Sequence, residues 1–162
     1  GALTKAIAKK MNLPDKDIDG ISIAGSIHDI GKIQIPSEIL CKPGSLLNEE
    51  FALIKTHSKA GYEIIKNIDF PYPVADILLQ HHERLDGSGY PKGLHDNEIL
   101  LGAKIVAVAD VVEAISAHRP YRPALGIDRA LEEIERMKGI QFDKTVVETC
   151  LSLFREDGFK FN

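Results

Sequence analysis

The stretch IVAVADVV, residues 105–112, decides the fold class of this chain. Its many β-branched residues would suit a buried strand as well as a buried helix. Apolar residues continue on both sides, however, so that the run extends over about 19 residues from Ile99 to Ala117. That length is too great for an ordinary buried strand and favours a helix. We therefore predict an all-α protein in which this run is the most apolar helix.

The same helical spacing of apolar residues recurs along the rest of the chain, and helices are expected to end where proline or glycine interrupts it. Residues 32–36 are predicted to be extended, and the glycine-rich residues 84–97 are predicted to form a loop. No repeat or linker is visible, so the fold expected is a single helical domain, residues 1–162, of about six or seven helices. The helices are predicted at 3–11, 15–29, 48–65, 74–83, 99–117, 128–139 and 143–158, with a short helical turn at 37–40.

Composition limits the class of protein. The chain has 162 residues, a net charge of −4 and a pI near 5.9, which gives no general affinity for DNA or for a membrane surface. No uninterrupted apolar run approaches the roughly 20 residues of a membrane span. Cys41 and Cys150 lie far apart in no metal-binding pattern, which is typical of reduced thiols in the cytoplasm. The chain begins inside a helical pattern without methionine, so we expect it to be a piece of a longer protein.

Six polar residues stand at helix positions where apolar residues would be expected. Asp110 is the hardest to explain by packing, because a buried carboxylate needs a compensating charge and no Lys or Arg lies within one turn of it. The histidines have ordinary alternatives, since His57 could be a core residue bonded to a carbonyl and the His81-His82 pair could be a fraying helix end. A cation held between segments would explain the whole set, which comprises His28, Asp29, His57, His81, His82 and Asp110.

Four imidazoles and two carboxylates form a mixed nitrogen and oxygen donor set. Such a set suits iron, manganese or another first-row divalent ion, and without a thiolate it does not suit a structural zinc site. Six ligands are too many for one ion that must keep an open position, so two ions are the simpler interpretation. Asp29 could bridge them, with a hydroxide between the ions as nucleophile, an arrangement suited to attack on a phosphoester.

In their order along the chain, HDIGK (28–32), His57, HHERLDGSGYP (81–91), Asp110 and RPYR (119–122) resemble the motifs of the HD-GYP family. Members of this family are bacterial phosphodiesterases of the HD superfamily that act on cyclic dinucleotides, chiefly cyclic di-GMP. The resemblance covers nearly the whole chain. It implies a cyclic-di-GMP phosphodiesterase that yields the linear dinucleotide pGpG and, after a second cut, GMP.

The resemblance also implies a role for each matching residue. One metal would be held by His28, Asp29 and Asp110, and a second by Asp29, His57, His81 and His82. Lys32 would contact the scissile phosphate and help the leaving oxygen, and Gly89, Tyr90 and Pro91 would shape the substrate groove. Arg119 and Arg122 would grip guanine or phosphate, although either could instead form a surface ion pair with Glu113 or Asp86. Glu83 and Asp86 are expected to orient the imidazoles or the loop.

The chain departs from the family pattern at its beginning. Members of the family carry a further histidine, and some a glutamate, on the helix before the HD motif, and both would fall just before Gly1. Occupancy of the first metal site therefore stays open, and a degenerate domain that only binds the nucleotide or a partner protein is one alternative. A phosphodiesterase for a related cyclic dinucleotide is another. The resemblance leads us to expect the output domain of a signalling protein, with a second copy or a signalling protein as partner.

Overall fold

The computed structural model describes residues 1–116 and 126–161. The described residues form helices, turns and two isolated β-bridges, so the all-α prediction is confirmed. Arg119 and Arg122 lie outside the described residues. The elements are α1 (Ala2–Lys10), α2 (Asp15–Ile27), η1 (Ile30–Gln34), α3 (Ser37–Leu40), α4 (Asn48–Lys55), α5 (His57–Ile65), α6 (Val74–Gln80), η2 (Asp96–Glu98), α7 (Leu101–Ser116), α8 (Ile127–Arg136) and α9 (Lys144–Arg155).

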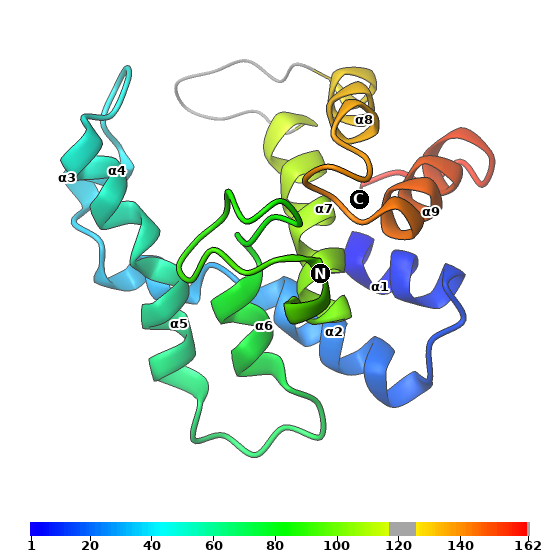
Figure 1. Cartoon of the computed structure of the whole chain (residues 1–162), viewed down its shortest axis with the longest axis horizontal. Coiled ribbons are helices and arrows are strands. Elements are labelled where there is room, and N and C mark those ends of the chain that lie inside the picture. The colour runs from blue at the N-terminus through cyan, green and yellow to red at the C-terminus, as the bar shows by residue number, and fades with distance from the viewer. Residues whose placement is uncertain (117–125, 162) are drawn as a thin grey trace.

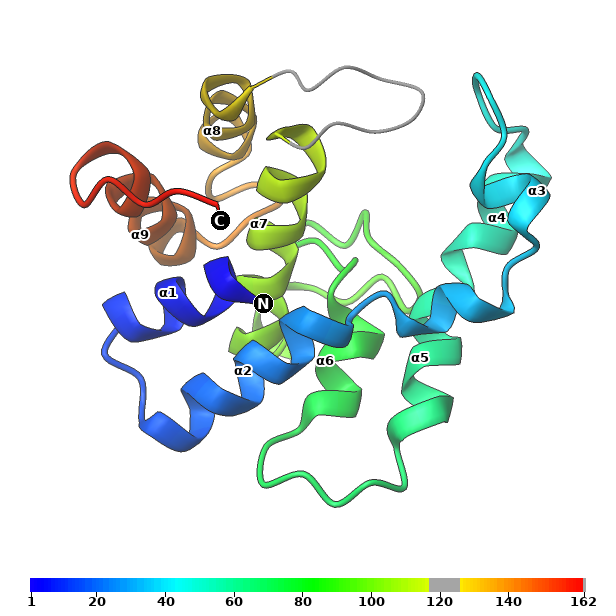
Figure 2. The same cartoon turned by 180° about the vertical axis from the view of Figure 1, so that it is seen from behind.

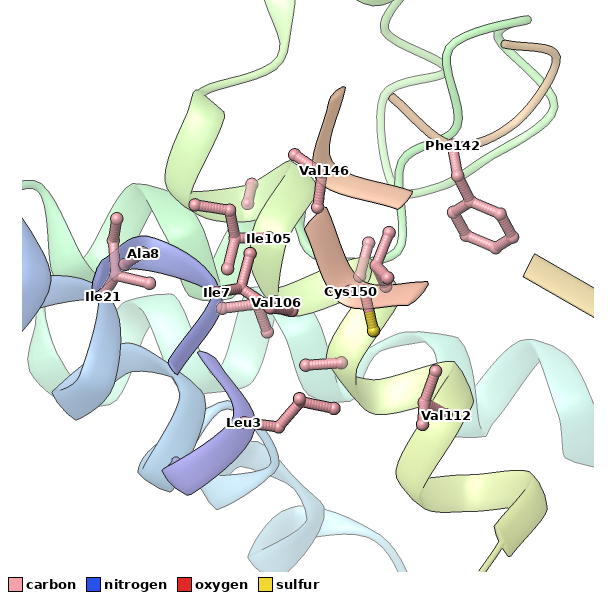
Figure 3. Packing of buried hydrophobic residues seen from close by; sticks show 14 of the residues in the cluster. Leu3, Ile7, Ala8, Ile21, Ile105, Val106, Val112, Phe142, Val146 and Cys150 are labelled. Atoms are coloured by element: carbon pink, nitrogen blue, oxygen red, sulfur yellow. The ribbon is translucent and has the colours of Figure 1, made fainter. Parts of the chain in front are cut away.

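Helix α7 lies at the centre of the molecule (Figures 1 and 2). It contacts α1, α2, α6, α8 and α9, so apolar side chains on every side of it become buried. Figure 3 shows Ile105 and Val106 of α7 packed beside Ile7 of α1 and Val146 of α9. Each of these side chains is at most 1% exposed, and burial of one such side chain contributes roughly 1.5–3 kcal/mol. The most apolar stretch of the sequence is thus the axis of the fold.

Two local predictions were wrong. The helix expected over 48–65 is broken at Thr56, where the hydroxyl and the amide of Thr56 both bond to the carbonyl of Leu53 and tighten the turn. Residues 32–34, expected to be extended, belong to the 3₁₀-helix η1, and only Ile35 and Pro36 have extended backbone. Both changes occur where η1 packs against α5, which no pattern along one segment can reveal.

Helices α3 and α4 form an arm that extends from the body of the molecule, and neither buries a residue (Figures 1 and 2). The loop after α6 carries the GYP segment, in which Tyr90 contacts His82 just after α6 and Lys55 at the end of α4. Among the described residues, none of the helices combines the length and the apolar character needed to cross a membrane.

Candidate metal centre

The four histidines of the predicted set lie at helix ends. His28 follows the last residue of α2, His57 is the first residue of α5, and His81 and His82 directly follow α6. Helix α6 packs against both α2 and α5, so these three ends meet. The side chains of His57 and His81 are among the largest fully buried ones in the described chain. The structure therefore gathers residues that are up to 54 positions apart in sequence.

Three of the four imidazoles are oriented in the same way. In each, Nδ1 lies within hydrogen-bond distance of the backbone carbonyl three residues earlier, and because a carbonyl only accepts, Nδ1 must carry the hydrogen. The bonds are His28 to Gly25 at 2.9 Å, His57 to Ile54 at 2.7 Å and His81 to Leu78 at 2.6 Å. This leaves the lone pair of each Nε2 free, which is the tautomer and second contact expected of a metal-binding histidine.

The Nε2 atoms of these histidines, which carry lone pairs and no hydrogen in this tautomer, point toward one another. Nε2 of His57 and Nε2 of His81 are 3.4 Å apart, and the ligand atoms of His57, His81 and His82 all lie within 4.8 Å of one another. Nε2 of His28 is buried and has no hydrogen-bond partner in the described part of the chain. Buried polar atoms are normally satisfied, so this cluster fits a cation that accepts several lone pairs. If His57 were only a core histidine bonded to a carbonyl, its Nδ1 would be explained by the bond to Ile54, but its Nε2 would stay unexplained.

The two carboxylates complete the set. Oδ1 of Asp29 is 3.5 Å from Nε2 of His57, while Oδ2 of Asp29 is 3.6 Å from Nε2 of His28. Oδ1 of Asp110 is 3.4 Å from the same nitrogen of His28. Asp29 therefore faces a histidine with each of its oxygens, as a carboxylate shared by two cations would. All six residues of the predicted set lie together.

The electrostatics keep most of the cluster ready for a cation. Burial lowers the pKa of His81 to about 3 and that of His82 to about 2, so both rings are neutral at ordinary pH. Burial would also lower the pKa of His28, but the carboxylates of Asp110 and Asp29 raise it overall. Burial would raise the pKa of Asp110, yet His28 and the two other histidines hold it below its usual range. Neutral rings and ionised carboxylates are the forms that bind metal.

Lys32 and Tyr90, both predicted to contact substrate, border the cluster. Nζ of Lys32 lies 2.6 Å from Oδ2 of Asp29, which holds the ammonium beside the carboxylate. The ring of Tyr90 stacks on His82 with 4.7 Å between centroids. Gly89 approaches the backbone of residues 82–84 so closely that a Cβ would lie 2.4 Å from the amide nitrogen of Arg84. The GYP segment is thus pressed onto the chain that carries the histidine pair.

Glu83 joins that loop to the centre. Its side chain is 2% exposed, and its two oxygens accept the backbone N–H of Lys92 at 2.7 Å and of Leu94 at 2.9 Å. The carboxylate therefore positions the residues just after Pro91 relative to His82.

Two residues near the centre were not singled out in the sequence. Arg84 lies over the ring of Phe142, with 5.0 Å from Cζ to the centroid, and Lys55 lies over Tyr90 at 5.3 Å. The place of Arg84 between Glu83 and the GYP segment was the available signal. For Lys55 no such signal existed, because its contact depends on the break at Thr56.

The chain resembles known proteins in sequence and in fold. The HD domain family matches residues 1–146. A protein of Thermotoga maritima named cyclic di-GMP phosphodiesterase is 42% identical over 158 residues, which cover 96% of this chain and 43% of that protein. A 3'3'-cGAMP-specific phosphodiesterase of Vibrio cholerae is 38% identical over 132 residues, 82% of this chain and 29% of that protein. The chain thus spans less than half the length of these relatives.

A solved structure shares the fold. It is described as an HDG"Y"P protein from Bdellovibrio bacteriovorus and superposes with a TM-score of 0.76 at 20% identity, covering 94% of this chain and 49% of that one. At this identity the likeness concerns the fold alone. The family match over residues 1–146 shows that the chain belongs to the HD domain family.

Proposed function

We propose that this chain is the catalytic domain of a metal-dependent phosphodiesterase that hydrolyses cyclic dinucleotides, with cyclic di-GMP as the first candidate. The observation that carries the proposal is the position of Asp29, which presents one oxygen to His57 and the other to His28. A carboxylate that faces a different imidazole with each oxygen could be shared by two ions, which fits a two-metal phosphodiesterase.

Two divalent ions fit the donor set, with iron and manganese favoured by its nitrogen and oxygen atoms. His28, Asp29 and Asp110 would hold one ion, and Asp29, His57, His81 and His82 the other. When bound, the ions supply Lewis acidity toward the phosphodiester and lower the pKa of water. Nε2 of His28 is buried, makes no hydrogen bond within the described residues and faces the carboxylates of Asp29 and Asp110, which supports a ligand role for His28.

The surrounding side chains would bind and orient the substrate. Lys32 would contact the scissile phosphate, where its charge stabilises the negative oxygen that leaves the phosphorus. Tyr90, stacked on His82, and its neighbours Gly89 and Pro91 would form one wall of the groove. The substrate roles of Arg119 and Arg122 remain predictions from the sequence.

The names of the relatives support the substrate class. Cyclic di-GMP and 3'3'-cGAMP are both cyclic dinucleotides that contain at least one guanine. We take cyclic di-GMP, cut to linear pGpG and then to GMP, as the principal reaction, within a cytoplasmic signalling protein. The free thiols Cys41 and Cys150 support the cytoplasmic placement.

Turnover by the metal-loaded chain tests this proposal. Purified protein loaded with Fe(II) or Mn(II) under reducing, anaerobic conditions should convert cyclic di-GMP to pGpG. Chromatography measures the pGpG that is formed. Asp29→Asn should abolish turnover. If the loaded protein binds cyclic di-GMP in calorimetry but releases no product, it is a binding domain and the catalytic proposal is wrong.

A further inference from the structure

A cavity of about 440 Å³ opens beside the metal centre, between α7, α8 and the turn that precedes α9. Its wall includes Asp110 itself, together with Arg84, Ile115, Glu133 and Phe142. The volume lies within the range of about 300–1,000 Å³ typical of small-ligand sites. Because Asp110 lines this cavity, a cyclic dinucleotide whose phosphate meets an ion held by His28, Asp29 and Asp110 would lie beside it.

Arg84 is held in place on the wall of the cavity. Its Nη1 donates to the carbonyl of Glu83 at 2.8 Å and, over a longer 3.4 Å, to that of His81. Its guanidinium also lies over Phe142, which is only 5% exposed and therefore cannot move freely. These contacts tie the guanidinium to the same backbone that carries the histidine pair, so its position relative to the metal centre is fixed.

Among the described residues, no carboxylate lies at ion-pair distance from the guanidinium of Arg84, and the two hydrogen bonds of this guanidinium both use Nη1. Burial lowers the pKa of Arg84, although the charges of Asp110 and other neighbouring groups act in the opposite direction. A fixed guanidinium with donors left over suits a ligand that presents two acceptors side by side.

We propose that this cavity receives one guanine base of the cyclic dinucleotide and that Arg84 reads its O6 and N7. A planar guanidinium matches these two adjacent acceptors, whereas adenine presents an amino donor in place of O6. The inference rests on the proposed function and adds the specificity of the same site. One guanine reader suffices for either candidate substrate, because cyclic di-GMP and 3'3'-cGAMP each supply a guanine.

Arg84 could instead serve only the fold. It follows α6, where a cation that binds free carbonyls stabilises the helix end. A structural role of that kind would affect all substrates equally, while a base reader would change the preference between them. The ratio of rates therefore separates the two roles.

The test compares Arg84→Met and Arg84→Lys with the unaltered chain on cyclic di-GMP, cyclic di-AMP and bis(p-nitrophenyl) phosphate, which has no base. We expect the unaltered chain to prefer cyclic di-GMP. Arg84→Met should lower kcat/KM for cyclic di-GMP about 5- to 150-fold, the range for loss of one bidentate base contact. Activity on bis(p-nitrophenyl) phosphate should change less than twofold. Arg84→Lys should also lose most of the preference, because an ammonium lacks the planar fork.

The matched control is Arg155→Met, an exposed arginine of α9 that pairs with Glu135 far from the cavity, and it should leave all rates unchanged. Base analogues refine the test. Cyclic di-IMP keeps O6 and N7 and should behave like cyclic di-GMP. The unaltered chain should cleave the 7-deazaguanine analogue more slowly than cyclic di-GMP. Arg84→Met should cleave the analogue no more slowly than the unaltered chain does.

Equal losses on every substrate, or an unchanged preference for guanine, would overturn the assignment of Arg84. If the unaltered chain cleaves none of the substrates, the catalytic proposal fails separately, and the ratio of Kd values for cyclic di-GMP and cyclic di-AMP is measured instead. A preference for guanine that Arg84→Met removes would then still support the base site. Equal binding of both nucleotides, or binding of neither, would refute it.

Discussion

Nε2 of His57 and Nε2 of His81 face each other at 3.4 Å, although the hydrogen of each ring is already donated through Nδ1 to a carbonyl. Two lone pairs at that separation repel each other in a nearly dry environment. A positive charge between or beside them would remove this repulsion. This pair of atoms is therefore the clearest structural sign that the centre is built for a cation.

The metal content of the protein should depend on the His57–His81 pair. We expect about two Fe or Mn ions per chain after loading, measured by inductively coupled plasma mass spectrometry, and loss of at least one ion in His81→Asn. Chelation should lower the melting temperature, because binding to the folded state stabilises it. The exposed His95→Asn is the matched control and should retain the full metal content. Equal metal in both variants would contradict the assignment.

Lys32 should affect the chemical step more than the fold. Its ammonium is bonded to Asp29 but is 35% exposed, so its loss leaves little buried surface unsatisfied. Lys32→Met should lower kcat on cyclic di-GMP about 10²- to 10³-fold, as removal of one charge-stabilising donor does. Metal content must be measured in the same sample, with the exposed Lys59→Met as control. A normal kcat would exclude contact with the reacting phosphate.

Glu83 should be needed for the position of the GYP loop. Glu83→Gln keeps one acceptor oxygen but leaves the second backbone N–H, of Lys92 or Leu94, without a partner. An unsatisfied buried donor costs about 1–3 kcal/mol, measurable by urea unfolding. The control is Glu98→Gln, since Glu98 accepts the N–H of His95 on an exposed turn. If Glu83→Gln and Glu98→Gln both lower the free energy of unfolding by the same small amount, the carboxylate of Glu83 does not hold the GYP loop.

Gly31 should tolerate no side chain. A Cβ there would lie 1.9 Å from the carbonyl oxygen of His57 and 2.5 Å from the amide nitrogen of Gly61, and both are backbone atoms. Gly31→Ala should therefore push η1 away from α5, with a loss of about 1–3 kcal/mol or more and lower activity, because Asp29 precedes η1. At Gly61 the nearest atom to a Cβ is the tip of Leu78 at 3.4 Å, an ordinary contact. Gly61→Ala is accordingly the control, and similar behaviour of the two variants would refute the packing argument.

The metal-free protein should lose stability as the pH falls below about 6.5. His81 and His82 have lowered pKa values in the folded chain, so between those values and about 6.5 the unfolded chain binds more protons. Each ring then lowers the free energy of unfolding by about 1.4 kcal/mol per pH unit, or by about 2 kcal/mol between pH 6.5 and 5. The raised pKa of His28 acts in the opposite direction and offsets part of the loss. Urea unfolding with chelator at pH 7 and pH 5 measures the net change, and stability that stays constant or increases would contradict this account.

Much of the candidate centre was visible in the sequence because its residues violate local patterns. A carboxylate inside residues 105–112 and a histidine on an apolar helix face are costly unless something compensates them, so they can be recognised without neighbours. The helical class was equally visible, since an apolar run of that length has one economical conformation. Arg84 was missed because a charged residue in a polar loop violates no local pattern, and only its place between Glu83 and the GYP segment pointed to it.

The amino-acid sequence by itself determined the all-α class, the central apolar helix and the identity of six candidate ligands, because each depends on periodicity or on burial cost within one segment. Tertiary structure alone decided the rest. The break at Thr56, the close approach of Gly31 to His57 and the two directions in which Asp29 points depend on contacts between η1, α5 and α6. So does the cavity at Arg84, whose walls come from segments that meet only when α7, α8 and the turn before α9 pack together. Such contacts are set by the shapes of distant surfaces, which no single stretch of the chain encodes.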